Sequence, residues 1–304
     1  MLSNDLIKKR ILIIGSNGML GQRLTDFFSK DKKVELMCAS VEDSSLIPDV
    51  NYSQLDVTQK NKVKELILGF FPDIILNTAA YTNVDKAESE RETAWKINVN
   101  GTENIALYGW TIDAHMIHIS SDYIFDGKNG PYLEDDKPAP IGYYGRTKLA
   151  SENSIRVSGV RFSIIRTNIL YGPAKYGRPD FVKWVINSLR DGKPVNIVTD
   201  QVGNPTYIDD IVSAINKLIE FKKEGIYNIG GGEILSRFNF TLRIADYFNL
   251  DRNLIIPIIT KDLNQPAPRP LKSGLITLKA ETELGYRPRS IKETFELMKK
   301  ELNL

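Results

Sequence analysis

Short apolar runs alternate along the chain with segments of helical periodicity. The runs that predict strands are 11–15, 34–40, 51–57, 72–80, 115–121 and 161–170, and helical patterns such as 61–70 and 92–110 lie between them. Most of these runs are apolar rather than alternating, which is typical of strands that helices cover on both faces. The pattern therefore predicts an α/β fold with a Rossmann-type doubly wound parallel sheet.

The regular alternation ends after residue 170. A loop rich in glycine and proline covers 171–180, and helical patterns near 180–191 and 207–224 flank a strand at 195–199. The run 225–232 predicts a last strand that returns to the main sheet. The second half of the chain is therefore expected to form a smaller C-terminal lobe threaded through the first half.

Composition excludes several classes of protein. The 304 residues carry 40 Lys and Arg against 38 Asp and Glu, so no basic surface suits nucleic acid. No apolar stretch approaches the roughly 18 residues that cross a bilayer, and the opening MLSNDLIKKR lacks the apolar centre of a signal peptide. Neither nucleic acid nor a membrane is an expected partner.

Metal and thiol chemistry are not expected either. Cys38 is the single cysteine, so no internal disulfide forms, which fits a reducing compartment such as the cytoplasm. The two histidines, His115 and His118, lie in or beside the predicted strand 115–121, where packing is the simpler role. We predict no metal site and a cytoplasmic protein.

A glycine-rich turn follows the first predicted strand. Gly15, Gly18 and Gly21 stand in ILIIGSNGMLGQ with the spacing G-x-x-G-x-x-G, where a helix is expected to begin. Glycine lets the backbone approach a pyrophosphate, which meets the free N–H groups of the helix start. A plain turn is the alternative, but the strand–loop–helix order favours a dinucleotide site.

The end of the second predicted strand bears on the choice of dinucleotide. Strand 34–40 ends in CAS, without the acid that grips the ribose 2′-hydroxyl in NAD enzymes, and Glu42 and Asp43 come slightly later. Ser40 could bind a 2′-phosphate and Arg23 could reach it, although both also fit ordinary surface positions. The pattern leans toward NADPH, with NADH as the alternative.

The stretch YYGRTK, residues 143–148, suits proton transfer. If it opens a helix, Tyr144 and Lys148 share a face, whereas Tyr143 points about 140° away from the lysine. A free tyrosine has a pKa of about 10, and a nearby ammonium lowers it. Tyr144 is therefore the candidate proton donor, and a helix-start aromatic beside a solvated lysine is the simpler alternative.

The predicted strand 115–121 delivers hydroxyl groups to the same region. It ends in ISSD, which places Ser120, Ser121 and Asp122 at the C-terminal edge of the sheet, where open α/β folds bind ligands. A serine can hold a substrate carbonyl oxygen while hydride arrives from a nicotinamide. A serine, Tyr144 and Lys148 together form a coherent catalytic set.

These motifs together resemble the extended short-chain dehydrogenases/reductases, and more narrowly the dTDP-4-dehydrorhamnose reductase family. The matching segments run nearly end to end: GSNGMLGQ, NTAAYTNVDKAE, INVNGTENIA, ISSDYIFDG, YYGRTKLASE, RTNILYG, DQVGNPTYIDD and APRPLKSGL. The resemblance implies NAD(P)H-dependent reduction of the 4-keto group of a dTDP-linked 6-deoxyhexulose, as in dTDP-L-rhamnose formation. A homodimer is one possible assembly.

The resemblance also implies roles for individual residues. It assigns catalysis to Ser121, Tyr144 and Lys148. The implied cofactor contacts are the three glycines, Asn17, Met19, Leu20, Ser40, Asp56, Val57, Ala79, Ala80, Tyr81, Asn98, Tyr144 and Lys148. The implied substrate contacts are Thr82, Val84 and Ser121 on the sheet side, and Asn168, Ile169, Gln201, Thr206 and Arg269 on the lobe side.

Two of the substrate positions leave alternatives open. Ile169 stands where many of these reductases carry a tryptophan that shapes the sugar pocket, and an aliphatic residue there also resembles the regulatory β subunit of methionine adenosyltransferase, which binds NADP. Arg269 suits a diphosphate because its guanidinium donates two parallel hydrogen bonds, or it is a solvated loop residue. A different nucleotide-sugar reductase or an epimerase, and a non-catalytic regulatory subunit, remain alternatives to the reductase.

The expected division of the chain follows from these assignments. Residues 1–165, with the returning segment 207–230, form the predicted dinucleotide-binding domain. Residues 166–206 and 231–304 form the predicted substrate-binding lobe. The substrate is then expected to bind between the sheet edge and this lobe.

Overall fold

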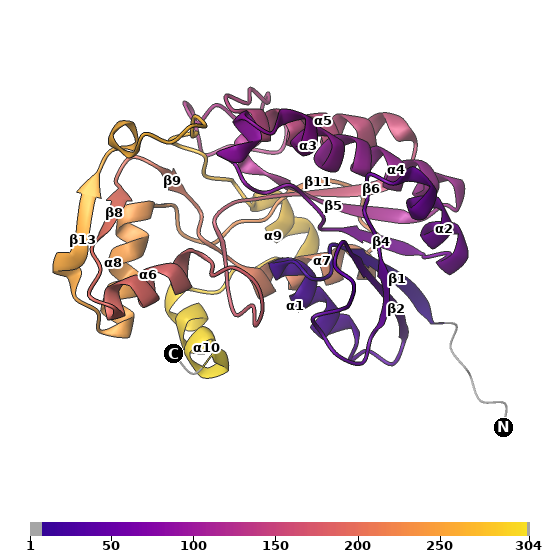
Figure 1. Ribbon diagram of the computed structural model, residues 1–304, viewed down its shortest axis with the longest axis horizontal. Helices are drawn as coiled ribbons and strands as arrows, with labels where there is room; N and C mark the ends of the chain where they lie inside the picture. The colour runs from indigo at the N-terminus through magenta and orange to yellow at the C-terminus, as the bar shows by residue number, and fades with distance from the viewer. Residues whose placement is uncertain (1–7, 303–304) are drawn as a thin grey trace.

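The computed structural model describes residues 8–302, and Figure 1 shows a parallel sheet with helices on both faces and a smaller lobe beside it. The sheet has the strand order β11–β6–β5–β4–β1–β2–β3 and all its pairs are parallel. Its strands are β1 (Lys9–Ile14), β2 (Val34–Ser40), β3 (Asn51–Gln54), β4 (Ile74–Asn77), β5 (His115–Ser121), β6 (Arg161–Thr167) and β11 (Gly225–Asn228). The predicted doubly wound parallel sheet is confirmed.

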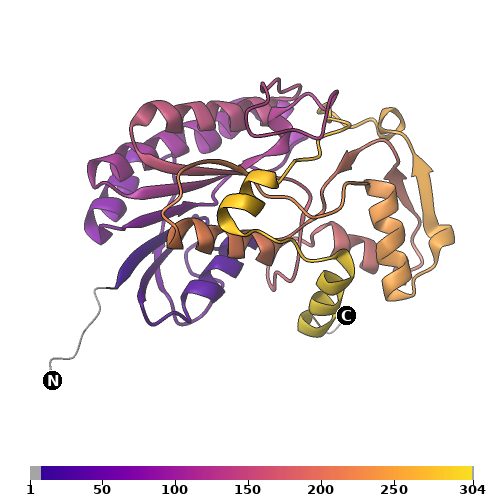
Figure 2. The same cartoon turned by 180° about the vertical axis from the view of Figure 1, so that it is seen from behind.

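Helices cover both faces of the sheet. One face carries α2 (Lys60–Phe70), α3 (Arg91–Trp95), α4 (Gly101–Thr111) and α5 (Tyr143–Ser158), and the other carries α1 (Met19–Phe28), α7 (Ile208–Glu220) and α9 (Leu278–Leu284). Seen from behind, in Figure 2, α9 and α7 lie across the sheet. Alternate residues of β1 enter opposite cores: Ile11 and Ile13 pack with α1 and α7, whereas Leu12 and Ile14 pack with α2, α4 and α5.

The smaller lobe has a core of its own, built by α6 (Phe181–Arg190), α8 (Arg237–Phe248) and α10 (Ile291–Leu302) around a cluster that includes Phe240 and Phe295. Its short strands pair as β13 (Ile255–Ile258) with β8 (Val195–Val198), β12 (Leu235–Ser236) with β9 (Val202–Gly203), and β10 (Thr206–Tyr207) with β7 (Leu170–Tyr171). Short 3-10 turns cover Lys86–Glu88, Asp122–Ile124, Arg252–Leu254 and Thr260–Leu263.

The chain passes between the main sheet and this lobe more than once. Strand β11 joins the sheet beside β6, so the segment after α7 does return to it. The residue boundaries that we drew between a dinucleotide-binding domain and a substrate-binding lobe stay a prediction.

Three predicted elements are interrupted in the structure. The predicted strand 161–170 ends at Thr167, because Ile169 adopts a positive φ of 42° that no strand contains. The predicted strand 51–57 ends at Gln54, after which the chain turns toward α2. The helical pattern 92–110 contains a π-helical turn at Lys96–Asn100, between α3 and α4. All three breaks lie beside the cavity described below.

Residues 1–7, on which our reading of the N-terminus chiefly rests, lie outside the described residues. Among residues 8–302, none of the helices combines the length and the apolar character that crossing a membrane requires.

Candidate active site

A cavity of about 970 Å³ opens at the carboxyl ends of the sheet strands, where the order reverses between β1 and β4. The glycine-rich loop and the loop after β2 line one end, and the ends of β4, β5 and β6 line its floor. The segment 176–181, which leads into α6, closes another side. This is the place where doubly wound sheets bind dinucleotides.

The glycine-rich loop has the shape of a phosphate cradle. Gly15 has a φ of 86°, and a Cβ on Gly21 would lie 2.1 Å from the Gly15 carbonyl oxygen, so both positions need glycine for the fold itself. A Cβ on Gly18 would meet only the Gly15 oxygen, at 3.3 Å. The first turn of α1 contains no acidic residue and no side chain caps it, so its N–H groups are free for an anion.

Two further features fit a dinucleotide in this cradle. The buried Ser16 hydroxyl has no hydrogen-bond partner among the described residues. Met19 and Leu20 line the cavity beside it, as predicted. The glycine loop and the uncapped helix together suit a pyrophosphate, although Ser16 does not itself line the cavity.

Asn17 holds the loop after β2 against the glycine-rich loop. Its amide nitrogen donates to the Glu42 carboxylate at 3.0 Å and to the Ser44 carbonyl at 2.9 Å, and its amide oxygen accepts from the Leu46 N–H at 3.0 Å. Glu42 and Ser40 therefore both line the cavity. Although burial opposes it, hydrogen bonding to Ser40 and Asn17 lowers the pKa of Glu42, so its carboxylate is charged at neutral pH.

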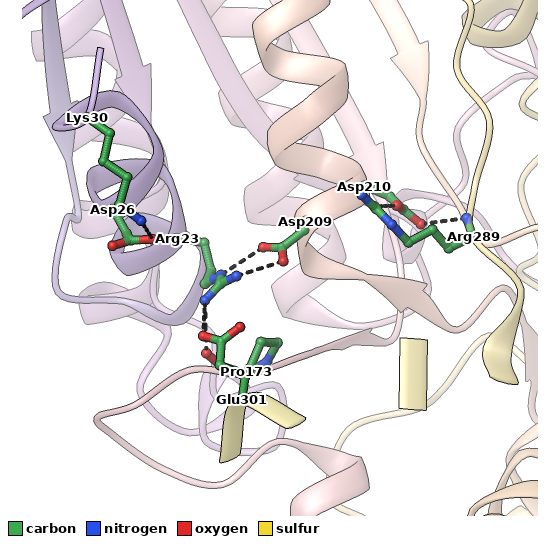
Figure 3. A network of polar contacts seen from close by, with 8 residues as sticks. All are labelled: Arg23, Asp26, Lys30, Pro173, Asp209, Asp210, Arg289 and Glu301. Carbon is green, nitrogen blue, oxygen red and sulfur yellow. Dashed lines mark hydrogen bonds and ion pairs between the residues drawn. The ribbon is translucent and has the colours of Figure 1, made fainter. Parts of the chain in front are cut away.

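Arg23 does not reach this end of the cavity. Figure 3 shows its guanidinium between Asp209 of α7 and Glu301 of α10, where it donates to both oxygens of Asp209 at 2.7 Å and also pairs with Glu301. Our expectation that Arg23 could bind a 2′-phosphate is wrong, because these two carboxylates occupy it. Arg23 instead ties α1 to α7 and α10.

The predicted adenine and nicotinamide contacts divide into two groups. Asp56, Val57, Ala79 and Ala80 line the cavity. Asn98 is buried, and its amide accepts from the Tyr81 N–H at 2.7 Å and donates to the Thr147 hydroxyl at 2.8 Å. The Tyr81 hydroxyl donates to Glu90 instead. Asn98 and Tyr81 therefore position the wall of the cavity without lining it themselves.

Tyr144 faces the cavity from the first turn of α5. Its ring packs edge-on against Tyr123, with centroids 5.6 Å apart. Gly145 allows this approach, because a Cβ there would lie 2.0 Å from the Tyr123 carbonyl oxygen. Tyr143 points elsewhere: its ring lies beneath the Arg91 guanidinium, 5.2 Å away. The predicted helical phasing of the two tyrosines is thus seen in the structure.

Ser121 lies beside Tyr144, at the end of β5. Its hydroxyl hydrogen-bonds the phenol, which lowers the pKa of Tyr144, but burial is the larger cause and raises that pKa well above its ordinary value. The neighbouring Ser120 donates to the buried Glu152 at 2.6 Å instead. Ser121 is therefore the serine available to a ligand, as the resemblance implied.

Lys148 lies one turn below Tyr144, fully buried. Its ammonium donates to the Ile119 carbonyl at 2.7 Å and lies 3.5 Å from the His118 ring, and among the described residues it makes no hydrogen bond to Tyr144. Burial lowers the pKa of Lys148 to about 8. The expected direct lowering of the tyrosine pKa by this ammonium is not seen, because the β5 carbonyl holds it.

Asp122 carries a carboxylate that sequence reasoning placed at this edge without a role. It accepts from the Ser121 hydroxyl at 3.0 Å and from the Ser273 hydroxyl at 2.5 Å, and it lines the cavity. Burial raises the pKa of Asp122 to about 6. Asp122 therefore fixes the Ser121 hydroxyl and joins the sheet edge to the lobe.

The predicted substrate contacts are only partly brought together. Thr82, Asn168 and Ile169 line the cavity, but Val84, Gln201, Thr206 and Arg269 do not. Thr206 is fully buried and donates to the Asn204 carbonyl, and Gln201 donates to Thr260. Arg269 donates to Asp85 at 2.8 Å, and its side chain is only 8% exposed. The spacing of a loop motif does not reveal which of its side chains turn inward.

Sequence reasoning also set aside or missed functional candidates. Glu42 was judged to come too late after β2, yet it lies 21 residues after Gly21, close to the spacing of about 20 at which NAD enzymes place their ribose-binding acid. The segment after β7 gave no such signal, yet its Tyr176 exchanges backbone hydrogen bonds with the Gln22 amide, at 3.1 and 3.3 Å, and lines the cavity.

Comparison with known proteins places these observations in a family. The profile described as RmlD substrate binding domain matches residues 9–304. A dTDP-4-dehydrorhamnose reductase of Aggregatibacter actinomycetemcomitans is 32% identical over 291 residues, covering 92% of this chain and 94% of that protein. The methionine adenosyltransferase 2 subunit beta of Xenopus tropicalis is also 32% identical, covering 90% of this chain and 82% of that protein.

Solved structures agree with the sequence comparison. A dTDP-4-dehydrorhamnose reductase from Clostridium acetobutylicum superposes with a TM-score of 0.88 at 32% identity, covering 97% of this chain and all of the other. One from Bacillus anthracis, in complex with NADP, has a TM-score of 0.83 at 32% identity, covering 97% and 99%. The chain therefore belongs to the dTDP-4-dehydrorhamnose reductase family of extended short-chain dehydrogenases/reductases.

Proposed function

We propose that this protein reduces the 4-keto group of a dTDP-linked 6-deoxyhexulose with NADPH or NADH, as in dTDP-L-rhamnose formation. The observation that carries the proposal is the meeting of Ser121 and Tyr144 with the glycine-rich loop in one cavity. A nucleotide cradle and a proton donor in one cavity suit reduction of a carbonyl. Relatives at 32% identity bear the name of this reductase.

The chain's own groups suit the proton half of the reaction. Ser121, whose hydroxyl would turn from the Asp122 carboxylate to the substrate, would donate a hydrogen bond to the substrate's carbonyl oxygen. Tyr144 would give that oxygen its proton as negative charge develops on it. Gly18 and the start of α1 would hold the pyrophosphate of the cofactor. When bound, the reduced nicotinamide supplies the hydride.

The direct test follows nicotinamide absorbance with purified protein and a dTDP-4-keto-6-deoxyhexose. Oxidation that depends on both the sugar and the protein supports the proposal. Tight cofactor binding without turnover of any 4-keto nucleotide sugar would instead favour a non-catalytic regulatory subunit. Similarity to the methionine adenosyltransferase β subunit and the aliphatic Ile169 are what favour that second candidate.

Several predicted properties remain part of the proposal. We expect a cytoplasmic protein, which fits the free, buried thiol of Cys38. A homodimer remains a candidate assembly, and no metal is expected to take part. We also keep the division into a dinucleotide-binding domain and a substrate-binding lobe, with the sugar bound between them.

Replacing Ile169 by tryptophan is expected to lower KM for the sugar and leave kcat similar. Ile169 lines the cavity with a φ of 42°, a strained conformation for a β-branched residue, so the unbranched Cβ of tryptophan adds no backbone strain. An added ring could stack on the sugar or base, worth roughly 0.5–1.5 kcal/mol. Steady-state kinetics decide it: a large fall in kcat would mean that residue 169 also orients the reacting carbonyl.

We expect NADH to bind at least as tightly as NADPH, which reverses the leaning drawn from sequence. The charged Glu42 carboxylate lines the cavity, and the candidate cation Arg23 is held elsewhere, so a 2′-phosphate would meet a like charge. Glu42→Gln should improve NADPH binding relative to NADH by roughly tenfold. Fluorescence titration checks this, with Asp43→Asn as the control, because Asp43 accepts from Gln54 and does not line the cavity. An unchanged ratio in Glu42→Gln would refute it.

A further inference from the structure

A cation lies beside the cavity at the start of helix α8. Arg237 is the first residue of that helix, and its backbone N–H donates to the Gln201 carbonyl at 2.9 Å. The Ser236 hydroxyl caps the helix by accepting from the Asn239 N–H at 3.0 Å. The backbone of Arg237 is therefore fixed on both sides, which limits where its side chain can point.

The guanidinium of Arg237 is directed toward the cavity wall. It lies over the ring of Phe181, 5.1 Å from the centroid, and Phe181 lines the cavity. An arginine stacked on an aromatic face keeps its N–H edges free for other acceptors. Phe181 thus orients this cation without accepting a hydrogen bond from its N–H groups.

Arg237 differs from three arginines near the site that are paired, and from Arg178, which lines the cavity but is exposed. Arg269 pairs with Asp85, Arg166 with Glu152, and Arg23 with Asp209. Within residues 8–302, the Arg237 side chain makes neither an ion pair nor a hydrogen bond, although the residue is half-buried. Burial lowers the pKa of Arg237, the cavity-lining Tyr123 and Asp122 oppose this, and the like charge of Arg269 adds to the lowering. A cation taken out of water without a close partner is costly, and a bound anion would offset that cost.

A second unsatisfied group belongs to the lining of the same cavity. Thr167 lines the cavity at the end of β6, and its buried hydroxyl has no partner among the described residues. Orphaned buried hydroxyls are uncommon in folded proteins, and ligands are one way in which they are satisfied. The cavity therefore has one unpaired hydroxyl in its lining and one unpaired cation behind Phe181, and both can donate to a ligand with acceptor oxygens.

We propose that Arg237 binds a phosphoryl group of the nucleoside diphosphate part of the substrate, at the end of the cavity between the sheet and the smaller lobe. This is the role that the sequence assigned to Arg269, which Asp85 already occupies. A guanidinium offers paired donors that match the oxygens of a phosphate. The proposal rests on the proposed function for the choice of nucleotide.

The test compares dTDP with thymidine, both titrated by calorimetry into protein saturated with NADH. Arg237→Gln should weaken dTDP binding by roughly tenfold or more, because hydrogen bonds to a charged group are lost. Thymidine, which lacks phosphate, should bind equally to both proteins. Arg243→Gln is the matched control, because Arg243 lies on the same helix, is exposed, and pairs with Glu233. Its dTDP affinity should equal that of the wild type.

Several results would overturn the proposal: equal dTDP affinity in Arg237→Gln and wild type, an equal loss for thymidine, or no dTDP binding by the wild type. If Arg237→Gln does not fold, Arg237→Lys keeps the charge without the paired donors. That variant should show intermediate dTDP affinity, and wild-type affinity would overturn the proposal. A protein that binds dTDP through Arg237 but never reduces a 4-keto sugar would refute the proposed reaction alone.

Discussion

Tyr144→Phe is expected to lose turnover by roughly 10²–10⁴-fold while cofactor binding is retained. The phenol lies against Ser121 at the cavity floor, and the substituted ring would keep the edge-on packing against Tyr123, 5.6 Å between centroids. Only the proton for the reduced oxygen is removed. We therefore expect kcat to fall and the dissociation constant of NADH to stay the same. Stopped-flow turnover and fluorescence titration separate the two quantities.

The neighbouring tyrosine supplies the control for this prediction. Tyr143→Phe should keep substantial activity, because the Tyr143 ring packs with Arg91 and its backbone N–H donates to Glu88. If Tyr143→Phe were the inactive variant, the assignment of the proton donor would be wrong. Wild-type activity in both variants would show that neither phenol donates the proton.

Gly18→Val is expected to weaken cofactor binding by about a hundredfold or more, because two or more N–H bonds to phosphate would be lost. A Cβ at this position would meet only the Gly15 oxygen within 4 Å, and the φ of −68° suits any residue. The valine would therefore fill the space of the pyrophosphate and leave the protein folded. Titration with NADH or NADPH measures the effect.

Position 18 makes a cleaner test than the other glycines of the loop. Gly15 and Gly21 would clash with backbone atoms, so their variants would confuse folding with binding. Gly69→Val is a matched control, because Gly69 has no atom near its Cβ position and lies on α2, away from the cavity. A folded Gly18→Val that binds the cofactor normally would contradict a phosphate cradle here.

The predicted strands and the helical phase at the site came from local pattern. The runs 34–40 and 115–121 coincide with β2 and β5, because strands covered on both faces carry apolar residues on both sides. Tyr144 and Lys148 share a face of α5 because residues four apart always do. The glycine-rich turn after β1 was equally visible, since only glycine fits the backbone at positions 15 and 21. For these features the determining contacts are close in sequence.

Other features were decided by partners far along the chain. Arg269 pairs with Asp85, 184 residues away, and is therefore not free for the expected diphosphate. Arg23 pairs with Asp209 in the same way. The Lys148 ammonium binds the β5 carbonyl of Ile119, and Glu42 reaches the cavity through the amide of Asn17. A sequence shows that a charged group is present but not which distant group will neutralise it. Hydrophobic periodicity and turn chemistry therefore determined the architecture, whereas only the tertiary structure decided which charges stay free to bind a ligand.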